Sequence, residues 1–418
     1  MNRFTGNAAI YLGANALSAA IPFLLLPILT RVLTPADYGL VAMFTVVVSI
    51  LNAFTGLNVH GALGVRFFQR EPAEFARYAA ACLAILGVST LLVLLLVGAA
   101  GDWLEQGTGV PRAWLLVAVL TSAAQIIMNI RLTLWQVRGE ATKFGALQVT
   151  HSLVNAGLSL ALVILVAMAW RGRVLGITVA AVVCAALALW WLRREVSWPA
   201  ARGDLRDALS FGLPLIPHTI GGLLIAATDR VLVANLLDVA QAGIYMVALQ
   251  VGMTLGLLTE AFNKVYAPWL MAALKQPDAT LERRIVRGTY LYFVVVAVIA
   301  MLLGIAAPFL MTLLVGPQFS AAAGPVLYIA LGYAFGGMYY MVTNYVFYAS
   351  KTGRLALLTL AAGVFNVLVT YALIGANGLL GAAQAFMLSQ AALFLGTWWL
   401  AHRVRPMPWR LALQRVAA

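Results

Sequence analysis

The stretch Thr30-Arg31-Val32-Leu33 ends a proline-bearing apolar helix near the start of the chain, and the related stretch Asp229-Arg230-Val231-Leu232 occurs near its middle. Each stretch is followed by a Gly and a Tyr that open another apolar helix. Arg31 and Arg230 match at an offset of 199 residues, and an offset of 204 superposes Gly39 on Gly243. The pattern indicates two related halves, and transporters built from parallel repeats place their substrate site between such halves.

The composition excludes a soluble protein. Of the 418 residues, 63% are apolar and 10% are charged, and the mean hydropathy is +0.93. A helix needs about 20 mainly apolar residues to cross the hydrocarbon of a membrane. Because lipid offers no partners to an open backbone, the sequence predicts an all-α integral membrane protein. Twelve predicted transmembrane segments are centred near residues 19, 50, 88, 122, 157, 182, 225, 251, 301, 337, 364 and 389.

The most polar internal stretch, residues 193–206, separates the sixth predicted segment from the seventh. We therefore predict two domains, which are an N-terminal six-helix bundle at 1–200 and a C-terminal six-helix bundle with a short cytoplasmic tail at 201–418. No stretch between the predicted helices is long enough to fold as a separate soluble domain.

The distribution of basic residues predicts the orientation. Cytoplasmic loops carry the excess of Lys and Arg in membrane proteins, and twenty-two of the 27 basic residues fall on the side of the N-terminus. Both termini are therefore predicted to face the cytoplasm. The net charge of +13 is then a topology signal and an attraction to anionic membrane lipid, without need of nucleic acid. The five basic residues on the opposite side are Arg31, Arg112, Arg171, Arg173 and Arg230.

Residue types that carry catalysis are sparse. The predicted outer loops are short, and the His and Cys residues show no spacing typical of metal ligands. Both cysteines, Cys82 and Cys184, lie inside apolar runs, where a thiol behaves as a small hydrophobic group. We predict neither an enzyme nor a cofactor, and keep an integral-membrane polysaccharide polymerase or glycosyltransferase as the alternative of another class.

Charged residues within predicted membrane segments are candidate functional groups, because an ion in hydrocarbon normally faces a cavity or a partner. Asp229 and Arg230 lie inside the seventh segment, where a lock between helices is the alternative to a substrate role. Glu260 and Lys264 are one helical turn apart and are expected to pair. We predict a cationic substrate site from four residues, and ion coupling from Asp229, Glu260 or His151. The four cationic candidates are Arg31, Arg230, Lys264 and His60.

Polar side chains form stripes at helical spacing on four predicted helices. Amides and tyrosines can exchange hydrogen bonds with sugar hydroxyls, and aromatic rings can stack on sugar faces. The same residues also join helices to one another in membranes, so both interpretations stay open here. The predicted glycan-facing residues are Gln125, Asn129, Gln148, Asn155, Tyr340 and Asn344.

The run Leu26–Gly39, with the sequence LPILTRVLTPADYG, resembles the start of O-antigen and polysaccharide flippases of the Wzx type. The run Phe211–His218, with Asp229-Arg230 and Ala242–Tyr245 after it, is similar to the seventh and eighth helices of the same family. The likeness extends over nearly the whole chain in length, helix number and topology.

This resemblance implies membership of the MOP superfamily, with two pseudo-symmetric six-helix bundles around a central cavity. It also implies a flippase that moves undecaprenyl-diphosphate-linked oligosaccharide, the repeat unit of O-antigen, capsule or exopolysaccharide, across the bacterial inner membrane by alternating access. The cations named above would then bind the diphosphate and the polar stripes the glycan, with H⁺ or Na⁺ as candidate coupling ions. A polysaccharide polymerase or assembly complex is a candidate partner.

A cation-coupled multidrug exporter is the alternative within the same superfamily. Such a protein is expected to attract organic cations with acidic side chains in its cavity. The first predicted helix has no acidic residue between Ala8 and Thr30, which disfavours this alternative.

Overall fold

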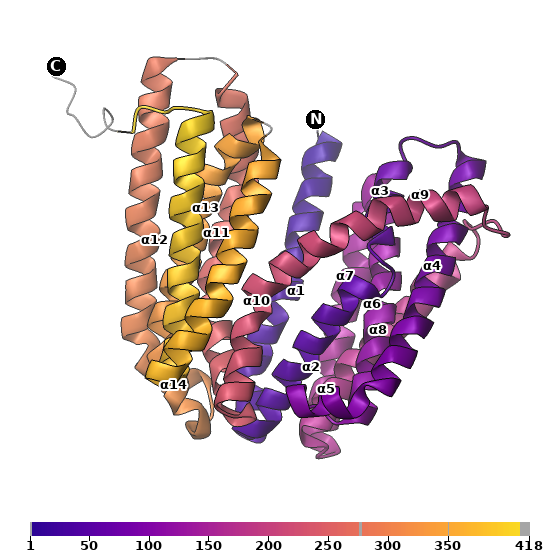
Figure 1. Cartoon of the computed structure of the whole chain (residues 1–418), viewed down its shortest axis with the longest axis horizontal. Helices are drawn as coiled ribbons and strands as arrows, with labels where there is room; N and C mark the ends of the chain where they lie inside the picture. The colour runs from indigo at the N-terminus through magenta and orange to yellow at the C-terminus, as the bar shows by residue number, and fades with distance from the viewer. Residues whose placement is uncertain (1, 276–277, 350, 410–418) are drawn as a thin grey trace. The chain divides into compact units, whose positions relative to one another are not determined.

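The computed structural model describes residues 2–275, 278–349 and 351–409 (Figure 1). Within these ranges the regular elements are helices and no strand occurs, which confirms the predicted all-α class. In chain order they are α1 (Asn2–Val32), α2 (Pro35–Phe54), α3 (Val59–Arg66), α4 (Pro72–Ala99), α5 (Gly101–Thr108), α6 (Arg112–Val137), α7 (Ala141–Leu160), η1 (Ala161–Leu165), α8 (Ala169–Leu192), α9 (Arg202–Gly212), η2 (Leu213–Leu215), α10 (Ile216–Leu236), α11 (Val239–Ala273), α12 (Ala279–Leu314), η3 (Pro317–Ala322), α13 (Ala323–Tyr348) and α14 (Thr352–Val404).

Eleven helical segments in the described ranges are long and apolar enough to cross a membrane. The last of them lies in α14, which has 53 residues and changes direction at Gly378, where φ is 56° and ψ is −135°. Residues with a Cβ rarely adopt this conformation. The predicted segments near residues 364 and 389 therefore lie on the two sides of one kink, and the other ten each fall within a separate span.

Contacts within the chain define two compact units. The first comprises Met1–Leu223 with Asp238–Gly243, and the second comprises Leu224–Leu237 with Ile244–Ala418. The predicted boundary at residue 200 falls just before α9, whereas the contacts group α9 with the first unit. The reason is electrostatic, since two aspartates of α9 pair with Arg66 at the end of α3 and with Arg70 between α3 and α4.

In the first unit, α3, α4, α6 and α9 pack around one apolar cluster. Each of these helices contributes a side chain that is at most 1% exposed, namely Val59, Tyr78, Ile130 and Ala208. Such close packing stabilises helix contacts mainly through dispersion when the surroundings are lipid. One face of α6 packs in this cluster, and its opposite face is directed toward α1, α7 and α8.

The first turns of α2 and α11 meet at two glycines of the first unit. A capping box begins α2, in which Asp37 N donates to Thr34 Oγ1 over 3.1 Å and Thr34 N donates to Asp37 Oδ2 over 3.0 Å. A Cβ on Gly39 would collide with the carbonyl of Val239, and one on Gly243 would lie 2.7 Å from Gly39 N. The two glycines that the sequence offset superposes therefore lie in mutual contact, where a side chain would hold the helices apart.

The second unit is built around an aromatic core of α12, α13 and α14. Phe293 and Phe394 meet edge to face with ring centroids 5.2 Å apart, and Trp398 meets Trp409 in the same way at 5.4 Å. Edge-to-face contact is the favoured geometry of aromatic pairs. Tyr345 completes the core and is fully buried.

Candidate functional site

A polar cavity of about 290 Å³ lies inside the first unit, and four membrane-spanning helices supply its lining. These helices are α1, α6, α7 and α8. The cavity is the place where residues from two of the predicted polar stripes meet. It is lined by Ser18, Ile21, Pro22, Met128, Asn129, Leu132, Gln148, His151, Ser152, Asn155 and Arg173.

Two glycines one turn apart bring α8 close to α7 and to η1, which follows α7. A Cβ on Gly172 would lie 2.8 Å from the carbonyl carbon of Leu162, and one on Gly176 would lie 2.7 Å from Ser159 N. The spacing is that of the Gly-x-x-x-Gly pattern, which lets membrane helices approach backbone to backbone. Arg173 follows directly after Gly172, so this approach places its side chain against α7.

The guanidinium of Arg173 is held by neutral groups of α7. Its Nη1 donates to Asn155 Oδ1 and to Ser159 Oγ, each over 2.6 Å, and Ser159 Oγ donates to Asn155 Oδ1 over 3.3 Å. None of the residues that line the cavity carries a carboxylate. The arginine therefore has no negatively charged partner among the residues that line the cavity, and Coulomb attraction to an anion is stronger in a partly buried site than in water.

Other lining groups leave hydrogen-bonding capacity open. Gln148 Nε2 donates to Asn15 Oδ1 of α1 over 2.9 Å. Among the described residues, His151 Nε2 and Ser18 Oγ are buried and have no hydrogen-bond partner. A buried polar atom without a partner is costly, and a ligand that accepts or donates there would remove that cost.

The remaining polar candidates of the first unit lie elsewhere. Gln125 Oε1 accepts a hydrogen bond from Asn52 Nδ2 over 3.0 Å, and Ser122 Oγ donates to Asn52 Oδ1 over 2.8 Å, so Gln125 joins α6 to α2. Arg31 is exposed at the end of α1. His60 is half-buried in α3, and burial lowers its pKa, which favours the uncharged imidazole at neutral pH.

In the second unit, Asp229 accepts two hydrogen bonds. Tyr245 Oη donates to its Oδ2 over 2.9 Å, and the backbone N of Arg230 donates to its Oδ1 over 2.8 Å. Asp229 and Tyr245 are 2% and 0% exposed, so this bond joins α10 to α11 out of contact with solvent. The geometry is that of a lock between helices, and the substrate role predicted for Arg230 stays a prediction.

Glu260 and Lys264 form the expected ion pair along α11, with Lys264 Nζ 2.8 Å from Glu260 Oε1. Both side chains are more than 40% exposed. Exposed ion pairs of this kind contribute little to stability. Asn344 of α13 donates to Asn263 Oδ1 of α11 over 3.0 Å and also to the carbonyl of Tyr340 over 2.9 Å. This amide joins two helices, and Tyr340 contributes its backbone to the contact.

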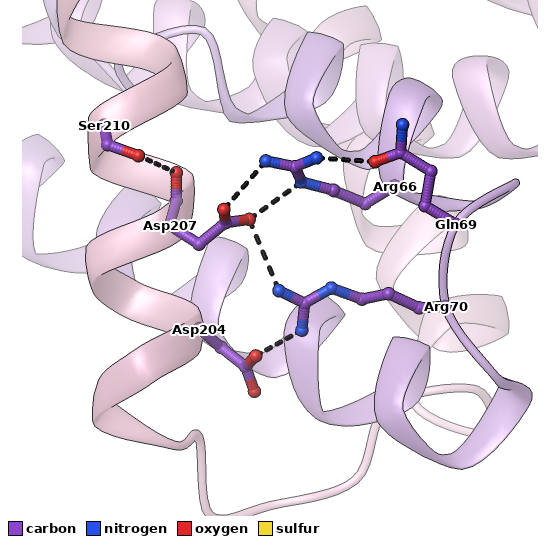
Figure 2. Close-up of polar contacts among 6 residues, drawn as sticks. All are labelled: Arg66, Gln69, Arg70, Asp204, Asp207 and Ser210. Carbon is purple, nitrogen blue, oxygen red and sulfur yellow. Dashed lines mark hydrogen bonds and ion pairs between the residues drawn. The ribbon is translucent and has the colours of Figure 1, made fainter.

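A different group of arginines binds α9 to the rest of the first unit (Figure 2). Arg66 Nη2 lies 2.8 Å from Asp207 Oδ1, and Arg66 Nε donates to Asp207 Oδ2 over 2.9 Å. Arg70 pairs with Asp204, and its Nη2 also reaches Asp207 Oδ2 over 3.3 Å. The hydrogen bond from Arg66 holds the pKa of Asp207 below its usual range, and the same bond raises the pKa of Arg66.

Glu195, which follows α8, joins two further arginines. Its Oε1 accepts from Arg131 Nη1 over 2.7 Å, and its Oε2 lies 2.8 Å from Arg138 Nη2. Burial acts to raise the pKa of Glu195, but the hydrogen bonds from Arg138 and Arg131 outweigh it and hold that pKa below its usual range. Arg131 is 2% exposed and lies 4.4 Å from the Trp135 ring centroid. It is a structural residue of the first unit.

The sequence prediction missed Arg173 because it assigned this residue to an outer loop. In the structure α8 begins at Ala169, so Arg173 lies one turn inside a spanning helix. The signal was present in the sequence as glycines at 172 and 176 on either side of the arginine. By contrast, Asn129, Gln148, Asn155 and His151 were named from the sequence, and they do line one cavity.

Two solved structures share the fold of this chain. "Lipid II flippase MurJ, inward closed conformation" aligns with a TM-score of 0.75 at 11% sequence identity, covering 94% of this chain and 87% of that one. An inward-facing multidrug resistance MATE family transporter of the MOP superfamily aligns with a TM-score of 0.69 at 15% identity, covering 94% of each chain. The chain is thus a multi-pass membrane protein with the fold of MOP-superfamily transporters, as predicted.

The sequence comparisons define the family. Residues 28–324 match the family described as "Polysaccharide biosynthesis protein". An "Uncharacterized membrane protein" of Haemophilus influenzae is 24% identical over 362 residues, which cover 84% of this chain and 85% of that protein. "Uncharacterized membrane protein EpsK" of Bacillus subtilis is 27% identical over 401 residues, which cover 89% of this chain and 77% of that protein. The chain belongs to the polysaccharide biosynthesis protein family, which confirms the resemblance seen in its Leu26–Gly39 run.

Proposed function

We propose that the protein is a flippase that moves an undecaprenyl-diphosphate-linked oligosaccharide across the bacterial inner membrane by alternating access. The observation that carries the proposal is Arg173, a cation held by neutral groups in a cavity among membrane-spanning helices. The planar guanidinium matches the geometry of phosphate oxygens and retains its charge at any physiological pH. A diphosphate is the anionic part of the proposed substrate.

The rest of the lining fits the sugar end of the same substrate. Asn129, Gln148 and Asn155 carry amides that both donate and accept hydrogen bonds, and His151 adds a ring nitrogen without a partner among the described residues. An exporter of organic cations would be served poorly by this cavity, because the arginine repels its substrate.

The proposal extends to energy coupling and surroundings. Of the three residues named for ion coupling, His151 lies in the same cavity as Arg173. We propose that an H⁺ or Na⁺ gradient drives transport, with both termini in the cytoplasm and a polysaccharide polymerase or assembly complex as partner. Transport that continues at full rate after both gradients are collapsed would exclude ion coupling and leave the proposed substrate unaffected.

The test is leaflet exchange of a fluorescent undecaprenyl-diphosphate oligosaccharide in proteoliposomes. Native protein is compared with Arg173→Gln, Arg173→Lys and Arg77→Gln at matched folded levels. Arg77 is an exposed arginine of α4 and serves as the control for the loss of one charge. We expect Arg173→Gln to lower the rate by roughly a hundredfold, Arg173→Lys to retain part of it, and Arg77→Gln to match the native protein.

Two results would contradict the proposal. If folded Arg173→Gln protein moves the glycolipid at the native rate, Arg173 does not bind the substrate and the proposal loses its support. Native protein that moves no glycolipid but releases a cationic dye from liposomes would indicate a drug exporter instead.

A further inference from the structure

The segment Arg193–Trp198, which follows α8, covers two adjoining hollows on the first unit. Its conformation is fixed, because Ser197 N donates to the carbonyl of Ala76 over 3.1 Å and Glu195 pairs with two arginines. Val196 lines both hollows, so they adjoin one another at this residue. One of them is cationic and the other is apolar, and neither is part of the cavity around Arg173.

The cationic hollow has a volume of about 460 Å³. Arg70, Arg138 and Arg194 line it together with a single carboxylate, that of Glu195. Arg70 and Arg138 are already engaged in ion pairs, whereas Arg194 is exposed and lies 5.3 Å from the Trp190 ring centroid. The positive charge of this hollow is therefore only partly compensated.

Neighbouring pairs do not remove this excess. The ion pairs of Asp204, Asp207 and Glu195 bring three carboxylates to the arginines of this region. Five arginines either pair with these carboxylates or line the hollow. They are Arg66, Arg70, Arg131, Arg138 and Arg194. Five arginines face three carboxylates, so this region keeps an excess of positive charge that a bound anion would reduce.

The apolar hollow is a groove of about 520 Å³ between α4, α6 and α8. Leu83, Ile127 and Leu189 lie along it, and Arg193 and Trp198 lie at its end with the covering segment. A Cβ built on Gly87 would meet no atom within 4 Å, so this glycine leaves the groove open. Such a groove accepts hydrocarbon chains without a polar cost.

We infer that the two hollows form one binding site for an anionic phospholipid, with its phosphate against Arg194 and its acyl chains in the groove. The arrangement matches the order of groups in a lipid, since the arginines lie at the end of spanning helices and the groove runs along them. Basic pockets between spanning helices on the cytoplasmic face bind anionic head groups in this way. The basic-residue count assigns this end of the helices to the cytoplasm. The membrane itself supplies the ligand, and charge complementarity selects phosphatidylglycerol over a zwitterionic lipid.

The experiment is native mass spectrometry of the detergent-purified full chain titrated with phosphatidylglycerol or with phosphatidylcholine of identical acyl chains. We expect phosphatidylglycerol to bind more tightly, and Arg194→Gln to weaken its binding roughly tenfold by removing one charge-assisted contact. Gly87→Leu fills the groove and is expected to weaken both lipids. Arg77→Gln removes an equal charge from α4 without touching either hollow and is expected to bind as the native protein does. Each variant is checked for native elution and helix content.

The outcomes separate the candidate ligands. Equal affinity for the two lipids, or unchanged phosphatidylglycerol binding in folded Arg194→Gln and Gly87→Leu, would overturn the inference. Displacement of phosphatidylglycerol by a much lower concentration of undecaprenyl diphosphate would identify the carrier lipid as the occupant and overturn the phospholipid assignment. Binding of inorganic pyrophosphate that is lost in Arg194→Gln but retained in Gly87→Leu would support the division into a phosphate hollow and a chain groove.

Discussion

Two regions of the first unit use arginine in opposite ways. In one region, Arg66 and Arg131 are held by the carboxylates of Asp207 and Glu195. Inside the cavity, Arg173 is held by an amide and a hydroxyl. A carboxylate neutralises the arginine and occupies the N–H groups that would otherwise bind a phosphate. A neutral acceptor orients the guanidinium but leaves its positive charge uncompensated. The partner, more than the arginine itself, separates a structural cation from one that can bind a ligand.

The same comparison applies to the second unit. Asp229 accepts a buried hydrogen bond from the Tyr245 hydroxyl, and Lys264 forms an ion pair with Glu260. Both arrangements resemble the ion-paired region of the first unit more than its cavity. The experiments below test this distinction, beginning with the contact that creates the cavity arrangement.

The first prediction concerns the approach of α8 to α7. Gly176→Ala places a Cβ within 2.8 Å of the Ser159 backbone, and the helices must separate to admit it. We expect a loss of about 1–3 kcal/mol in the free energy of unfolding, together with a loss of transport as Ser159 and Asn155 move away from Arg173. Thermal unfolding in detergent and the liposome assay measure the two effects.

The matched control is Gly157→Ala on α7, where a Cβ meets no atom within 4 Å. It is expected to be neutral or to stabilise by up to about 1 kcal/mol, because alanine restricts the unfolded chain and favours helix. Equal effects of the two substitutions would show that the α7–α8 contact is not as tight as the structure has it.

The second prediction converts the cavity arginine into a structural one. Asn155→Asp keeps the size of the side chain and places a carboxylate 2.6 Å from Arg173 Nη1. We expect the protein to be at least as stable as the native one, and transport of the glycolipid to fall roughly tenfold or more, because the carboxylate competes with the diphosphate. Asn155→Ser, which adds no charge, provides the comparison. A fully active Asn155→Asp protein would show that Arg173 does not meet the anionic part of the substrate.

The third prediction measures the ion pairs that hold α9. A double-mutant cycle with Arg66→Gln and Asp207→Asn is expected to give a coupling energy of about 1 kcal/mol, since the bond is bidentate and the side chains are only partly exposed. The comparison pair is Arg112 and Asp102, whose side chains are 51% and 81% exposed at a separation of 3.3 Å. There we expect a coupling energy near zero. A similar coupling energy in both cycles would mean that burial adds nothing at α9.

Hydropathy was sufficient to predict the all-α membrane class, because a spanning helix needs about 20 mainly apolar residues and lipid offers no partners to an open backbone. It located all twelve segments, including the two within α14. The kink at Gly378 could not be predicted, since a glycine in an apolar run is compatible with a straight helix. The packing of α9 on the first unit also could not be predicted from the sequence, because it depends on ion pairs between residues more than 130 positions apart.

The site was predicted only in part. Spacing by helical turns correctly placed Gln148 and Asn155 on one face, and these residues line the cavity. Spacing could not show that Gln125 reaches Asn52 on another helix, because the facing of two helices is a tertiary property. Arg173 was missed because helix ends are uncertain by a few residues in sequence, and a shift of one turn carries an arginine from a loop into the bundle.

The last prediction is the smallest effect and concerns acid stability. The pKa of Asp207 lies below its usual range chiefly because Arg66 donates to it, and the pKa of Glu195 is lowered by Arg138 and Arg131 against the effect of burial. The folded protein keeps these carboxylates ionised at a pH where the unfolded chain already binds protons. Their contribution is therefore complete above the unfolded pKa values of about 4 and declines as the pH falls through the folded values. Thermal unfolding between about pH 6 and pH 3 should show the native protein losing more stability than Asp207→Asn, and more again than Asp207→Asn with Glu195→Gln. Parallel curves for the three proteins would mean that these carboxylates titrate as they do in the unfolded chain, and the contrast with the carboxylate-free cavity of Arg173 would lose its electrostatic basis.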